Sequence, residues 1–160
     1  MSDLNVDDFF HDAASALIAL YQVFPRRKAI FVDDIIEPEE PDDFGMYSDR
    51  FLACYSTLLW LGEEGFLRFE ESINQEAIDQ AVLSGRCFTL LSSPAPESQQ
   101  LTDTQLPDSV RAERSSNLFA LRGALKEGSS AAVRTAMLNL LRQMNQLVER
   151  DLNEAHTGSG

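Results

Sequence analysis

Two segments with apolar residues at helical spacing, 7–24 and 48–61, constrain the fold of this chain more than any other feature. The first carries one stripe at steps of four and three: Phe10, Ala14, Leu17, Tyr21 and Phe24. Pro25 predicts its end, because the residue before proline is pushed out of helical geometry. The second, capped by Ser48 or Asp49, keeps its apolar residues within about a third of the helical circumference, with Tyr55 at the centre. Both segments are therefore predicted to be helices packed against a core.

Short β-type patterns surround the second helix. Residues 29–32 form a β-type run that a brief helix at 33–36 can follow, and residues 37–43 hold two prolines and five acids, which indicates a solvated loop. The alternation in 66–70 and the pattern in 77–83 predict two strands of a hairpin with its tip at 71–76. Ser84 then caps a short helix. The predicted fold class is therefore mainly α with a small β component (α+β).

The order of these elements resembles the winged-helix family. The residues that carry the resemblance are LLWLGEEGFL at 58–67, which is similar to the junction between helix end, glycine and first wing strand, and VLSG at 82–85, which is similar to the step after the wing. The resemblance covers residues 7–91, and the acidic proline loop departs from the compact family form. It implies a winged-helix domain over residues 1–91. In charge and fold the chain also loosely resembles the acidic winged-helix accessory subunits of bacterial chromosome-organising ATPase complexes.

The C-terminal part is predicted to be a helical hairpin extension. Residues 92–106 lack periodicity and indicate a linker, and residues 107–152 hold one helix from Pro107 to Glu127, a stop at Gly128 and a last helix capped by Ser129 or Ser130. The last helix bears a seam at steps of four and three: Val133, Met137, Leu140, Met144 and Leu147. The seam can pack within the chain or form a dimer interface. Residues 153–160 are expected to form a disordered tail.

The charge distribution decides which partners are expected. Residues 1–50 hold twelve acids and four bases, residues 51–100 hold seven and two, and residues 101–160 hold seven of each, which gives a net charge of −13. A duplex-binding protein neutralises several phosphates with Lys and Arg. We therefore do not expect nucleic-acid binding by this chain alone. The relatively basic C-terminal helices are expected to dock electrostatically on the acidic N-terminal half, so that salt loosens the docking.

Candidate binding residues lie on the second helix, on the face opposite Tyr55. That face is expected to present Arg50, Ala53, Thr57 and Trp60 to a protein partner, with Trp60 as the anchor, although the last helices or the wing can also cover Trp60. The acidic loop could contact a basic partner. For the alternative of nucleic-acid binding, the candidate cations are Arg26, Arg27, Lys28 and Arg68.

The sequence offers few residues in patterns typical of catalysis or cofactor binding. His11 and His156 are the two histidines, and the chain shows no Cys/His metal spacing, phosphate-cradling glycine loop or nucleophile motif. We expect no enzyme activity, cofactor, metal site or small-molecule ligand. Cys54 and Cys87 are expected to be buried free thiols, and the absence of a signal-peptide pattern and of a long apolar run predicts a cytoplasmic protein without a membrane span.

The function expected from these features is non-enzymatic: a protein–protein interaction module or accessory subunit, acting through a protein partner or through self-association. The alternative is a dimeric winged-helix transcriptional regulator that reads DNA through an assembled surface. An acidic DNA mimic or inhibitor is a third possibility.

Overall fold

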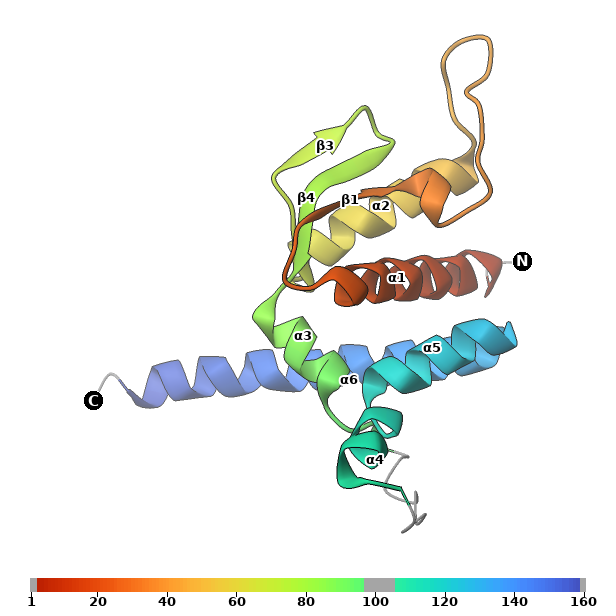
Figure 1. Cartoon of the computed structure of the whole chain (residues 1–160). Coiled ribbons are helices and arrows are strands. Elements are labelled where there is room, and N and C mark those ends of the chain that lie inside the picture. Colours follow the sequence, from red (N-terminus) through yellow and green to blue (C-terminus); the bar gives the residue numbers. More distant parts are fainter. Residues whose placement is uncertain (1–2, 97–105, 159–160) are drawn as a thin grey trace.

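Helix α1 (Asp3–Val23) is the centre of the molecule in the computed structural model, which describes residues 3–96 and 106–158. Figure 1 shows α1 between two layers: the sheet and α2 (Asp49–Glu63) on one side, and α3 (Gly85–Ser92), α5 (Asn117–Glu127) and α6 (Ser130–Thr157) on the other. Ala13, Ala14 and Ala16 of α1 are fully buried. Such small side chains allow neighbouring helices to approach closely. With six helices and four short strands among the described residues, the structure is mainly helical, as predicted.

The sheet is small and antiparallel. Its strands are β1 (Lys28–Phe31), β2 (Leu67–Arg68), β3 (Glu71–Ile73) and β4 (Ala77–Leu83). Strand β4 lies in the middle, with β1 on one edge and both β2 and β3 on the other. The 3-10 turn η1 (Val32–Asp34) follows β1, where a brief helix was predicted at 33–36. The predicted strands at 29–32 and 77–83 are confirmed to within one residue.

The first strand of the hairpin differs from the prediction. Instead of one strand at 66–70, the chain pairs with β4 twice, as β2 and then as β3. The turn is formed by Asn74 and Gln75, which have positive φ angles of 47° and 61°, and the Glu76 N–H donates to the Ile73 carbonyl at 2.7 Å. Two residues with positive φ define the tight turns whose twist matches that of the strands. The predicted six-residue tip is therefore a two-residue turn.

Serine side chains cap three of the helices where the sequence predicts them. The hydroxyls of Ser48, Ser84 and Ser129 accept hydrogen bonds from the backbone N–H three residues later. Gly128 takes the left-handed conformation, with φ of 68°, and ends α5.

The predicted single helix at 107–127 is wrong. It divides into α4 (Asp108–Arg114) and α5, because Ser116 adopts an extended conformation and caps α5 by accepting from the Phe119 N–H at 3.1 Å. The break also frees backbone groups for pairing with the segment after α3. The Ala95 N–H donates to the Ser115 carbonyl at 2.7 Å, and the Asn117 N–H donates to the Ser93 carbonyl at 2.8 Å.

Helix α6 docks on the rest of the chain through its apolar seam. Val133, Met137, Leu140 and Met144 are buried in a core that they share with α1, α2 and the sheet, and Leu147 packs at its edge. Arg134 bridges to Asp7 of α1, with Nε 3.2 Å from the carboxylate, and Arg86 of α3 pairs with Asp151 of α6. In the second pair the basic residue, Arg86, belongs to the N-terminal half and the acidic residue to α6. This is the opposite of the predicted arrangement, in which the C-terminal helices supply the basic residues. Docking therefore combines an apolar seam with one ion pair of the predicted polarity, Arg134–Asp7, and one of the opposite polarity, Arg86–Asp151.

Helix α6 also continues past residue 152 to Thr157, where a disordered tail was expected.

We predict that the packing of α6 depends on Met137 more than on Arg134. Met137→Ala removes a fully buried side chain and should lower the free energy of unfolding by about 2–5 kcal/mol. Arg134→Ala removes an ion pair whose Arg134 side chain is 41% exposed, and should cost less than about 1 kcal/mol. Urea unfolding measures both, with and without about 1 M NaCl. If salt lowers the free energy of unfolding as much as Met137→Ala does, the docking of α6 is chiefly electrostatic.

Candidate partner-binding surface

The residues predicted to form the outward face of α2 divide between the interior and the surface. Thr57 is 5% exposed, and its hydroxyl donates to the Ala53 carbonyl at 3.0 Å. Ala53 is exposed, whereas Arg50 is turned toward α1. The buried side of α2 is centred near Cys54 and Leu58 and not on Tyr55. The prediction that Arg50 and Thr57 are free for a partner is therefore wrong, because α1 packs on that side of α2.

Trp60 is half-buried at the edge of the core. Its ring meets the ring of Phe9 edge-on, with centroids 5.2 Å apart, and stacks on Phe66 at 6.0 Å. The aromatic side chains that contact Trp60 thus come from α1 and from the residue before β2. Part of Trp60 remains accessible, but it has a structural role in joining α1 to α2.

Arg50 instead closes a polar cluster between α1 and α2. It donates two hydrogen bonds to the carboxylate of Asp12, at 2.6 and 2.8 Å, and its Nε lies 3.5 Å from Asp8. Asp12 is 1% exposed and also bonds His11 at 3.0 Å. Burial by itself raises the pKa of Asp12, but the bonds from Arg50 and His11 outweigh it and hold the pKa below the usual value of 3.8. This cluster fixes the position of α2 on α1.

The two thiols are confirmed as free and buried. Burial raises the pKa of both Cys54 and Cys87 to about 12. Both therefore remain protonated at neutral pH and behave as core side chains.

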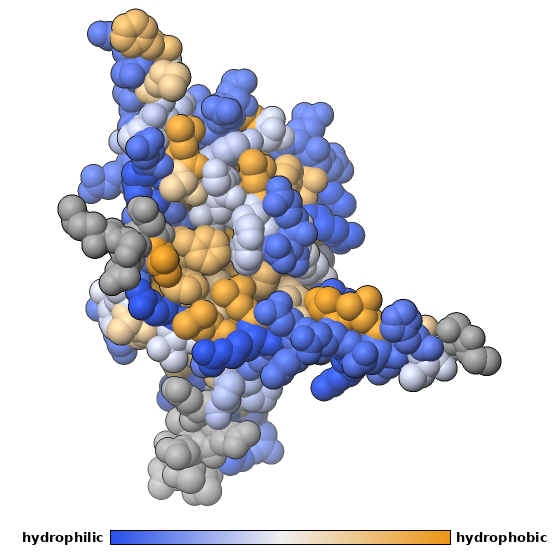
Figure 2. Space-filling model, turned by 180° about the vertical axis from the view of Figure 1, so that it is seen from behind, coloured by the Kyte–Doolittle hydropathy of each residue, from blue (hydrophilic) through white to orange (hydrophobic). Residues whose placement is uncertain are grey.

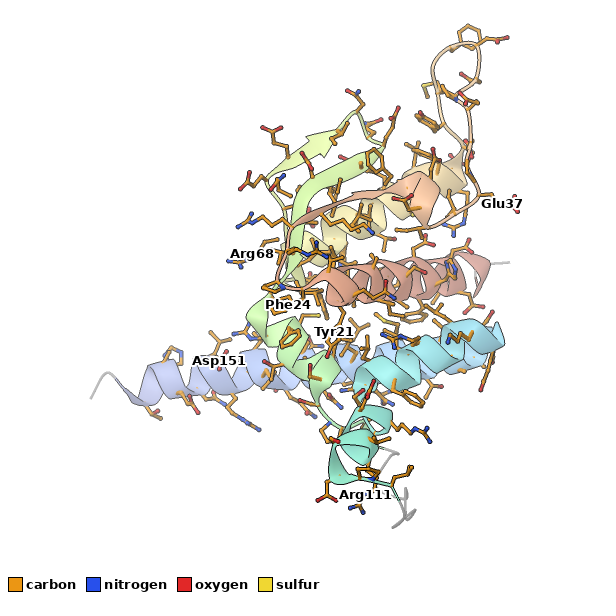
Figure 3. All side chains as sticks on the ribbon, viewed as in Figure 1. Tyr21, Phe24, Glu37, Arg68, Arg111 and Asp151 are labelled. Atoms are coloured by element: carbon orange, nitrogen blue, oxygen red, sulfur yellow. The ribbon has the colours of Figure 1, made fainter. Side chains whose placement is uncertain are left out.

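The basic residues do not form a continuous surface. Arg27 donates to Glu70 of the hairpin at 3.1 Å, which neutralises the cation in the middle of the run formed by Arg26, Arg27 and Lys28. Arg68 is exposed on β2, close in sequence to Glu70 and Glu71. Figure 3 places Arg68 beside the sheet and Arg111 on α4, on opposite sides of α1. The described residues of the sheet thus offer dispersed cations among carboxylates, and the one cation of α2, Arg50, is turned toward α1.

The most exposed aromatic residue belongs to the acidic tongue, which we define as residues 37–47. Phe44 is 90% exposed and Met46 is 61% exposed. Figure 1 shows the acidic tongue projecting from the body between η1 and α2, and Figure 2 shows hydrophobic side chains at its tip. The sequence reasoning recognised the charge of this loop but missed the two apolar residues. An aromatic residue inside an acidic, proline-containing run was the available signal.

Hydrogen bonds hold the acidic tongue in one shape. At its tip, Asp42 accepts from the N–H groups of Phe44 and Met46 at 2.9 and 2.8 Å, and the Asp42 N–H donates to the Met46 carbonyl at 2.8 Å. Gly45, with φ of 77°, permits this tight turn. The exposed apolar side chains therefore stand on a preformed turn.

The base of the acidic tongue is fixed to α2 and to the hairpin. The carboxylate of Glu39 accepts from the backbone N–H and the hydroxyl of Ser48 at 2.6 and 2.7 Å, and these bonds lower the pKa of Glu39. The Tyr47 ring stacks on Phe51 at 3.8 Å, and its hydroxyl donates to Glu76 at 2.7 Å, which raises the pKa of Tyr47 to about 12.

A groove of about 700 Å³ runs between α5 and α6. Small residues such as Gly123, Ala124 and Ala132 line it, together with Asn117. The Asn117 amide donates to the Leu90 carbonyl and to Gln143, at 2.8 and 2.9 Å, so these donors already serve the fold.

No protein-family model matches the chain, and no curated protein or solved structure does either. Within residues 3–96 and 106–158, no group of three His, Cys, Asp or Glu side chains is placed to hold a metal ion. None of the helices formed by these residues combines the length and hydropathy that a bilayer crossing requires. Fold and surface together define a mainly helical α+β protein with an exposed acidic tongue.

We predict that Arg50→Ala destabilises the fold by about 3 kcal/mol, because it leaves the buried Asp12 carboxylate without its main partner. Asp12→Asn should cost less, since it removes the charge as well. The pKa of Asp12 is lowered in the folded state, so its contribution is fully present above pH 3.8 and is lost as the pH falls through the native value. The difference between the wild type and Asp12→Asn should therefore shrink on acidification.

Urea unfolding at about pH 7 and pH 3 measures this difference. Asp43→Asn, at an exposed position of the acidic tongue, is the control and should leave stability unchanged. Equal stability of Arg50→Ala and Asp43→Asn would contradict the role of the Asp12–Arg50 pair.

We predict that the protein does not bind random-sequence duplex DNA, because the sheet and α2 present carboxylates to it. Fluorescence anisotropy at about 50 mM salt, where electrostatic binding is strongest, should detect no complex up to about 10 μM protein. Saturable, salt-sensitive binding in this range would contradict the electrostatic reading of this surface.

Proposed function

We propose that this protein is a non-enzymatic protein–protein adaptor or accessory subunit built on an acidic winged-helix fold, and that the acidic tongue is its contact. The observation that carries the proposal is Phe44, an almost fully exposed aromatic side chain on an ordered projection. Large aromatic residues dominate the binding energy of protein interfaces. A preformed turn also loses less conformational entropy on binding than a disordered loop does.

The topology supports the winged-helix part of this proposal. A first helix, a strand, a second main helix and a hairpin follow one another, and β1 pairs on the opposite edge of β4 from the hairpin. Between β1 and α2 the chain has only the 3-10 turn η1 before the acidic tongue begins. The acidic tongue thus occupies the stretch in which this chain departs from the compact family form.

The charge of the acidic tongue indicates the chemistry of its partner. Five acids, Glu37, Glu39, Glu40, Asp42 and Asp43, precede Phe44. A matching surface is an apolar pocket for Phe44 and Met46 with Lys and Arg residues on its rim, since complementary charges accelerate association and select the partner. The buried free thiols suit a reducing compartment, so we place the protein in the cytoplasm.

We predict that Phe44→Ala weakens binding to this partner by at least about tenfold, as loss of a hot-spot side chain does. A photocrosslinking amino acid at position 44 identifies the partner in an extract of the source cells. Calorimetry with the two purified proteins then measures the affinity. Phe44→Ala should not lower the stability, because the side chain is 90% exposed.

The matched control is Phe119→Ala, which removes an aromatic side chain that is 45% exposed on α5. It should bind with the affinity of the wild type. If Phe44→Ala and Phe119→Ala bind equally well, the acidic tongue is not the contact.

A further inference from the structure

Helix α6 carries a second apolar stripe beside the buried seam. We define the outer stripe as Leu138, Leu141, Asn145, Val148, Leu152 and Ala155. These residues follow one another at steps of three and four, and at 100° per residue they fall within an arc of about 100°. Leu138 and Leu141 are half-buried against the core, whereas Val148 is 37% exposed and Leu152 is 59% exposed. The helix therefore has the spacing of a coiled coil on a face that the rest of the chain covers only at its beginning.

The exposed half of the outer stripe lies on an overhang. Met144 is the last buried residue of α6, and every residue from 148 to 158 is exposed. Figure 1 shows this part of α6 extending past α3, and Figure 2 shows hydrophobic side chains along its flank. The Arg86–Asp151 pair is its contact with α3. A segment of this length is marginal as an isolated helix in water, so a partner that covers the outer stripe would stabilise it.

We propose that the outer stripe pairs with the outer stripe of a second copy of this chain, with the two α6 helices antiparallel. A two-fold axis between residues 146 and 147 places Leu141 opposite Leu152 of the second copy. The same register sets Leu138 against Ala155 of the second copy. Every apolar position of the outer stripe then meets an outer-stripe position of the other helix.

Charge complementarity selects the second copy as the occupant. Arg142 and Glu149 lie on the same flank of the outer stripe, both exposed. In the antiparallel register, Arg142 of each chain lies beside Glu149 of the other chain, so the dimer forms the attraction twice. The two helix dipoles also oppose one another. The net charge of −13 disfavours close approach elsewhere on the surface, which confines pairing to this balanced segment. The inference is independent of the acidic tongue.

The experiment measures the mass of the full chain by light scattering and sedimentation over about 1–100 μM protein, a range that resolves micromolar affinities. The wild type should form a dimer. Leu152→Asp should weaken it by at least about a hundredfold, because the pairing buries two copies of this side chain. Arg150→Gln changes the net charge by the same amount at an exposed position on the opposite side of α6 and should weaken it far less. Circular dichroism should show both variants folded.

The register is tested by exchanging charges. Arg142→Glu and Glu149→Arg should each weaken the dimer by about threefold to tenfold, and the double variant should restore it to within about twofold. A wild type that stays monomeric up to about 100 μM overturns the proposal, as does a dimer that is insensitive to Leu152→Asp. Failure of the double variant to restore pairing overturns the antiparallel register.

Discussion

Helix α1 is buried on most of its circumference, and the two layers of the structure meet across it. Its alanines face neighbours at close range, and Leu17 and Leu20 are also fully buried in the core. Near its C-terminal end, Tyr21 and Phe24 stack on Phe88 of α3, at 5.2 and 4.1 Å, and Figure 3 shows both pointing toward that helix. The C-terminal helices therefore share one core with the sheet and α2, because α1 has apolar residues on both of the sides that these two layers cover.

The Asp12–Arg50 pair fixes how α2 lies on this central helix. Apolar packing alone tolerates rotation of a helix about its axis, whereas a bidentate pair between a guanidinium and a buried carboxylate accepts one geometry. The pair also turns Arg50, the one cation of α2, toward α1. The orientation of α2 and the lack of basic groups on its outward face thus have the same cause.

The sequence predicted the local features of the fold well and the long-range ones poorly. Serine caps, Pro25 and Gly128 placed helix ends because their effects act within a few residues. The rotation of α2 was misjudged because its apolar residues leave the buried side ambiguous, and only the partner on α1 decides between the choices. The break at Ser116 depends on backbone pairing with residues 93–95, which helical periodicity cannot reveal. The exposure of Phe44 was not predicted, because an irregular loop has no period that shows which of its side chains are buried.

The acidic charge and the exposed apolar residues have to be understood together. Exposed aromatic and aliphatic side chains promote non-specific association, and a high net charge of one sign opposes it. In the acidic tongue the five carboxylates belong to the same loop as Phe44 and Met46, so an approaching surface must be both apolar and positively charged to bind. On α6, in contrast, Arg142 and Glu149 balance one another beside the outer stripe, so a second copy with the same pattern can approach. The charges around two similar apolar features thereby select different partners.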